Sequence, residues 1–156
     1  MNREGAKAQR NTRKGELMNF WEFREGDVRK VSEATERNAT TVIGEVIEVH
    51  TILGPNLPEI AYRRALLREL TLRGVPHECE HPVPIVYKGE LVAEGRVDVL
   101  VAGCLVIELK VVEALSDAHR AQVLAYLAAL KLELGLLINF NVTYVKDGIK
   151  RVIRTG

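Results

Sequence analysis

The chain has 156 residues, of which 47% are hydrophobic and 28% charged, a composition typical of one soluble globular domain with its own core. A net charge of +1 excludes a uniformly basic coat for nucleic acid, although it allows a local basic groove. No apolar run approaches the ~20 residues of a membrane span, and residues 1–15 lack the apolar segment of a signal peptide. Two cysteines make no disulfide framework, so we expect a cytoplasmic protein with no membrane partner.

The first 39 residues differ in character from the rest. Residues 1–15 carry five basic side chains and one acidic one without hydrophobic periodicity, which predicts a mobile basic arm that is either solvated or in contact with phosphates. Residues 16–38 mix charges with Phe20, Trp21 and Phe23, an aromatic group that could dock on the domain or on a partner. We therefore divide the chain into a charged extension, residues 1–39, and a domain, residues 40–156.

Two helices are predicted at the start of the domain. Apolar residues recur at helical spacing over residues 40–53, and Gly54-Pro55 interrupts that pattern. A second helix is predicted over residues 57–72, with Asn56 as its N-cap. Glu59 would then lie three residues after the cap, where it completes a capping box, points toward a functional site, or does both.

The remainder of the chain is predicted to contain one helix and five strands. A helix is predicted over residues 117–134, with Ser116 as its N-cap and Gly135 closing it. Five strands are predicted over residues 76–87, 91–101, 105–112, 136–140 and 149–153. Because the helix connects the third strand to the fourth, we expect these two strands to pair in parallel. The order ααβββαββ predicts an α/β (α+β) fold with a mixed sheet flanked by helices.

The second and third strands carry three ionisable residues within an apolar hairpin. If the turn centres on Gly103, Asp98 lies opposite Glu108 with Cβ atoms about 5 Å apart, and Lys110 shares the face of Glu108. A divalent cation between the two carboxylates would remove their repulsion, and Mg²⁺ prefers such oxygen ligands. The lysine could then orient water or a phosphate oxygen. An ion ladder that also includes Arg96, on a solvated face, is the alternative.

Polar side chains also form a stripe on the predicted helix 117–134. His119, Gln122 and Tyr126 fall at helical spacing on one face, while most of that helix is apolar. Such a stripe either satisfies backbone groups or faces a functional cleft.

The pattern of Asp98 followed across a hairpin by Glu108-Leu109-Lys110, in this element order, resembles the PD-(D/E)XK nuclease superfamily. More narrowly, residues 40–153 resemble the GxxExxY protein family, through the stretches 50–66, 96–112, 118–130 and 134–140. Asn56 stands where the family pattern begins with glycine, and the residues before Asp98 lack the proline often found in the superfamily.

The resemblance implies a restriction-endonuclease-like core and a metal-dependent nuclease that acts on nucleic acid, with DNA favoured over RNA. It implies that Asp98, Glu108 and Glu59 hold Mg²⁺ or Mn²⁺ and that Lys110 assists the attack of water. The residues expected to contact substrate are Gln122, Tyr126, His119, Arg96, Tyr62, Lys150 and Arg151. Many members pair up to cut two strands, so a homodimer stays open. A non-catalytic nucleic-acid-binding or assembly module on the same fold also stays open.

Overall fold

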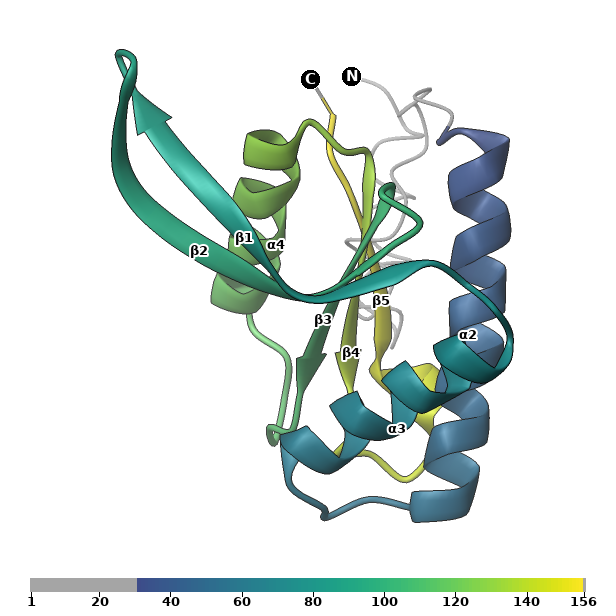
Figure 1. Ribbon diagram of the computed structural model, residues 1–156. Helices are drawn as coiled ribbons and strands as arrows, with labels where there is room; N and C mark the ends of the chain where they lie inside the picture. The colour runs from purple at the N-terminus through teal and green to yellow at the C-terminus, as the bar shows by residue number, and fades with distance from the viewer. Residues whose placement is uncertain (1–30, 156) are drawn as a thin grey trace, which may run out of the picture.

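The computed structural model describes residues 31–155 (Figure 1). The elements are α2 (Glu33–Leu53), α3 (Glu59–Leu72), β1 (His77–Tyr87), β2 (Glu90–Val101), β3 (Leu105–Lys110), α4 (Asp117–Leu130), β4 (Leu134–Asn139), a short 3₁₀ helix η2 (Val145–Gly148) and β5 (Ile149–Ile153). The strands form one sheet in the order β1-β2-β3-β4-β5. Only β3 and β4 pair in parallel, as predicted from the intervening helix, and the other neighbours are antiparallel. The predicted α/β class with a mixed sheet is therefore confirmed.

Helices cover both faces of this sheet. One apolar cluster joins α2 and α3 to the sheet, with Val46, Leu66 and Ile107 among its fully buried members. A second cluster lies under α4, where Val123 and Leu127 pack on the opposite face of the same strands. Burial of apolar surface in these two layers supplies the main stabilisation of the fold.

The first helix begins earlier than the predicted start at residue 40. Ser32 is the N-cap of α2, and its hydroxyl accepts a hydrogen bond from the Thr35 amide. Thr35 and Ala39 are buried, but the charged residues between them hide the helical periodicity in the sequence. The proposed boundary between residues 39 and 40 thus falls inside α2. The predicted basic arm and the aromatic group at residues 20–23 lie outside the described residues.

Two other predicted helix ends are corrected. Pro58, not Asn56, is the N-cap of α3, so the capping box predicted for Glu59 does not form among the described residues. Asn56 adopts a left-handed backbone, with a φ of 71°, in the loop before the helix. Helix α4 ends at Leu130, and Gly135 lies inside β4 rather than closing the helix. A Cβ atom at Gly135 would lie 2.6 Å from Cγ1 of Val123, so glycine lets α4 approach the sheet closely.

The long β1–β2 hairpin bends away from the rest of the sheet, which Figure 1 shows plainly. The bend coincides with a break in the strand alternation. Val99 packs in the cluster under α2 and α3, whereas Val97, two residues earlier, packs in the cluster under α4. Residues two apart in a regular strand share a face, so the backbone reverses its faces at Asp98. On the N-terminal side of Asp98, β2 does not pair with β3, whereas Val99 to Val101 on the C-terminal side do.

Candidate active site

The two predicted carboxylates meet where β2 separates from β3. The backbone amide of Asp98 donates a hydrogen bond to Oε1 of Glu108 at 3.1 Å. In return, the amide of Leu109 donates to Oδ2 of Asp98 at 2.7 Å. Each side chain therefore satisfies an amide that has lost its ladder partner at the bend. Because each carboxylate is held by a backbone group of the other strand, the pair is rigidly positioned.

Burial makes the negative charge of Glu108 costly. Glu108 is only 4% exposed, and burial, with the nearby negative charge of Asp98 as a further cause, raises its pKa from 4.5 to about 8. The amide of Asp98 and the charge of Lys110 act in the opposite direction. A positive ion near the two carboxylates would therefore lower the free energy of the ionised pair.

Glu59 belongs to the same electrostatic group. It is the first residue of α3, and its pKa is raised first by burial and then by the charge of Asp98. Lys110 and Arg63 lower it. The charges of Asp98, Lys110 and Arg63 all act on Glu59, so the first turn of α3 lies in the neighbourhood of the separated strands.

Arg63 is a member of this site that the sequence analysis did not identify. Its Nη1 atom lies 3.9 Å from Oδ1 of Asp98 and 3.4 Å from Oε1 of Glu80 in β1. The side chain is 20% exposed. Arg63 lies four residues after Glu59 on α3, and this i, i+4 spacing is the signal that could have revealed it.

Two residues of the polar stripe on α4 form a pair that contacts β2. The Gln122 side-chain amide donates to the Tyr126 hydroxyl at 3.2 Å. The Tyr126 ring covers Gly95, where a Cβ atom would lie 2.6 Å from the ring atom Cε1. Gly95 precedes Asp98 by three residues, so Tyr126 contacts the stretch of β2 that leads to Asp98.

His119 from the same stripe has a structural role. Its Nδ1 accepts a hydrogen bond from the Ser116 amide at 3.0 Å, and its own amide donates to the Ser116 hydroxyl at 3.3 Å. This reciprocal pair forms the capping box of α4. A histidine takes the place that Glu or Gln has in most capping boxes.

Two other residues predicted to contact substrate, Tyr62 and Arg96, lie in different settings. Tyr62 is fully buried, stacks on Phe140 with ring centroids 4.4 Å apart, and donates its hydroxyl proton to the carbonyl of Gly54. It therefore fixes the loop between α2 and α3 instead of facing a substrate. Arg96 is exposed on β2, two residues before Asp98, and remains available.

The two predicted cations of the last strand lie on the far side of β4 from the carboxylates. Lys150 is buried in β5 opposite Leu137. Arg151 donates two hydrogen bonds from its guanidinium group to the carboxylate of Glu36 at the start of α2. Arg151 thus ties the last strand to the first described helix.

The residues at the separated strands suit a hard cation. Mg²⁺ binds through one or two carboxylates, with water and phosphate completing its shell, and Asp98 and Glu108 supply such oxygens. Within residues 31–155, no three His, Cys, Asp or Glu side chains lie close enough to form a metal site by themselves. The donor set fits a cation whose remaining ligands come from solvent and substrate.

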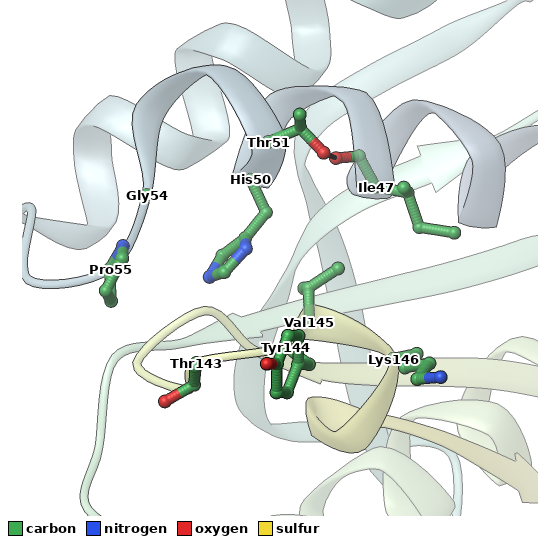
Figure 2. Close-up of a pocket in the computed structure, with 9 residues that line it drawn as sticks. All are labelled: Ile47, His50, Thr51, Gly54, Pro55, Thr143, Tyr144, Val145 and Lys146. Carbon is green, nitrogen blue, oxygen red and sulfur yellow. Dashed lines mark hydrogen bonds between the residues drawn. The ribbon is translucent and has the colours of Figure 1, made fainter.

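A separate pocket of about 360 Å³ lies between the C-terminal end of α2 and the loop after β4, where His50, Thr143 and Tyr144 are among the lining residues (Figure 2). None of the nine residues drawn there belongs to the predicted site. The carboxylates, rather than this pocket, are therefore the chemically distinctive part of the described structure.

Comparison with known proteins gives one family. The model of a family described as PD-(D/E)XK nuclease superfamily matches residues 36–152, which is well over half of the chain. No curated protein and no solved structure matches the chain. The mixed five-stranded sheet with helices on both faces agrees with a restriction-endonuclease-like fold. Across residues 31–155, no helix is both long and apolar enough to traverse a bilayer.

Proposed function

The chain belongs to the PD-(D/E)XK nuclease superfamily, and we propose that it hydrolyses phosphodiester bonds in DNA with Mg²⁺ or Mn²⁺ held by Asp98, Glu108 and Glu59. The observation that carries this proposal is the carboxylate pair at the bend of β2. Asp98 and Glu108 are joined by two hydrogen bonds to backbone amides, and burial disfavours the charge of Glu108. Preorganised charge of this kind is typical of catalytic sites.

Each residue has a distinct part in the proposed reaction. A divalent cation, when bound, would neutralise charge on the scissile phosphate and lower the pKa of attacking water. Asp98 and Glu108 would hold that cation, and Glu59 would complete the set from α3. Lys110, at the end of β3, would orient the attacking water or stabilise charge on a phosphate oxygen. Arg96, Gln122 and Tyr126 would contact the nucleic-acid backbone next to the carboxylates.

We extend the proposal to the narrower family, the location and the oligomeric state of the protein. The stretch from Asn56 through Glu59 to Tyr62 supports membership of the GxxExxY family. A cytoplasmic location is supported by the two free thiols of Cys79 and Cys104. A homodimer would allow both strands of a duplex to be cut.

A second candidate function has its own support. The ion pair between Arg63 and Asp98 shows that a side chain of this protein already offers positive charge to that carboxylate. This arrangement also suits a nucleic-acid-binding or assembly module that works without cleavage. Such a module would bind DNA equally well with and without Mg²⁺.

Metal binding and cleavage distinguish the two functions. Titration calorimetry with Mn²⁺ and Mg²⁺, alone and with a short DNA duplex, should detect a cation site in the wild type that Asp98→Ala removes. Cleavage of single- and double-stranded DNA and RNA should be lost in Asp98→Ala, in Lys110→Ala and in excess EDTA. Glu48→Ala, which removes an exposed carboxylate of α2, is the matched control and should keep full activity. Full activity of Asp98→Ala or in EDTA would refute the proposed mechanism.

A further inference from the structure

We propose that Arg63 competes with the divalent cation for Oδ1 of Asp98, and that Glu80 holds Arg63 when the cation binds, so that these two residues set the metal affinity of the site. This inference rests on the proposed metal site. It concerns the regulation of that site, and it assigns a role to two residues outside the predicted catalytic set.

The backbone hydrogen bonds at the site leave Oδ1 of Asp98 without a backbone donor. Oδ2 of Asp98 accepts the amide of Leu109, and Oε1 of Glu108 accepts the amide of Asp98. Arg63 approaches the other oxygen, Oδ1, with Nη1 at 3.9 Å. That separation is longer than a charged hydrogen bond, which is typically about 2.7–2.9 Å. Arg63 therefore neutralises Asp98 through space and can leave it without breaking a strong bond.

Glu80 offers Arg63 a second carboxylate at the same place. Its Oε1 lies 3.4 Å from the same Nη1 atom, closer than Asp98. The neighbouring register pairs, Cys79 with Val99 and His81 with Val97, place Glu80 across from Asp98 on β1. Glu80 is also 50% exposed, so it can accept a guanidinium that moves away from the site.

The backbone conformation of Glu80 supports a functional role for its contact with Arg63. Its φ is 52°, a left-handed conformation that is uncommon for a glutamate inside a strand. Strained backbone of this kind concentrates at functional sites. Here it coincides with the bend at which β1 and β2 leave the sheet, and it accompanies the approach of the Glu80 carboxylate to Arg63.

Two positive charges that share one carboxylate oxygen repel each other. Arginine stays protonated at every accessible pH, so Arg63 opposes a divalent cation at Oδ1 under all assay conditions. Removal of its charge should tighten metal binding, whereas a purely structural role would predict weaker binding. Removal of the Glu80 charge should weaken metal binding, because Arg63 then keeps Asp98 as its nearest anion.

A double-mutant cycle on metal affinity tests this coupling. The dissociation constant for Mn²⁺ is measured by calorimetry on the full chain at fixed salt for the wild type, Arg63→Met, Glu80→Gln and the double variant. We expect Arg63→Met to bind on the order of tenfold more tightly and Glu80→Gln to bind severalfold more weakly. Glu80→Gln should have no effect once Arg63 is Met. Arg64→Met, an exposed neighbour on α3, is the matched control and should bind like the wild type.

The outcomes separate this inference from the metal site on which it rests. If Mn²⁺ binding depends on Asp98 but Arg63→Met binds equally or more weakly, the competition is refuted while the site stands. Circular dichroism checks that Arg63→Met folds, and Glu80→Gln tests the same coupling if it does not. If the wild type, Arg63→Met and Glu80→Gln all fail to bind Mn²⁺, with and without DNA, both the proposed site and the competition are overturned.

Discussion

Replacement of Glu108 by glutamine should change the pH dependence of stability. The pKa of Glu108 is raised from 4.5 to about 8, chiefly by burial, so the folded protein holds a proton that the unfolded chain releases at lower pH. Below pH 4.5 Glu108 is protonated in both the folded and the unfolded state, so its raised pKa does not lower the free energy of unfolding. As pH rises from 4.5 to about 8, the unfolded state binds fewer protons, so the stability of the wild type falls. Glu108→Gln keeps an oxygen that can accept the Asp98 amide but removes the buried charge.

The size of the effect follows from the two pKa values. One pKa unit corresponds to about 1.4 kcal/mol, so a rise from 4.5 to about 8 sets an upper limit on the order of 5 kcal/mol. Structural relaxation around the ionised group will reduce this figure. We therefore expect Glu108→Gln to gain a few kcal/mol in free energy of unfolding, relative to the wild type, between pH 5 and pH 9.

Urea denaturation in EDTA at intervals from pH 5 to pH 9 measures this difference. The exposed control Glu48→Gln should follow the wild-type profile. A cation at the site favours the ionised carboxylate, so added Mn²⁺ should flatten the wild-type profile and leave Glu108→Gln unchanged. Parallel profiles for the wild type and Glu108→Gln in EDTA would refute the assignment of a raised pKa to this residue.

Two further predictions concern the core. Glu45→Met should raise the free energy of unfolding by roughly 1–4 kcal/mol in urea denaturation, because Glu45 is fully buried and, within residues 31–155, neither carboxylate oxygen has a hydrogen-bond partner. Burial raises the pKa of Glu45 above its usual value although Arg73 lies 3.6 Å away. The increase in free energy of unfolding should therefore be larger at pH 8 than at pH 5. An equal increase at both pH values would contradict the raised pKa. Gly95→Ala should lose about 1–3 kcal/mol by thermal unfolding because its Cβ meets the Tyr126 ring. Gly44→Ala, where the added Cβ has open space inside a helix, should instead be neutral or stabilising.

Local patterns in the sequence predict much of the fold and of the site. The turn at Gly103 places Asp98 and Glu108 side by side, since a tight hairpin fixes which residues face each other. The helix between β3 and β4 predicts their parallel pairing. These predictions succeed because each depends on residues close together along the chain.

The surroundings of residues in distant elements could not be predicted from local patterns. Lys150 and Arg151 look like free cations in the sequence, yet strand order puts β5 beyond β4, and Arg151 instead binds Glu36. Tyr62 shares a helix with Glu59, but the stacking of its ring on Phe140 buries it. Neither outcome follows from spacing, because both are set by which surfaces the sheet covers.

The role of Asp98 was also only partly predictable. A regular alternation places it on one face of β2, whereas the structure reverses the faces at this residue. The left-handed backbone of Glu80, which no sequence rule requires for a glutamate, lies across from the reversal. The i, i+4 spacing from Glu59 indicates that Arg63 shares its helix face, but its ion pairs with Asp98 and Glu80 depend on that local geometry.

The ion pair between Arg151 and Glu36 has a consequence for how the chain reaches its native state. It joins the last strand to the first described helix, so closure of that layer needs contacts of high sequence separation. The proposed catalytic residues, by contrast, all lie from Glu59 to Lys110. They belong to α3 and to the consecutive antiparallel strands β2 and β3. We therefore expect the surroundings of Asp98 to acquire native contacts before α2 docks on β5, with destabilising changes at Glu36 mainly accelerating unfolding.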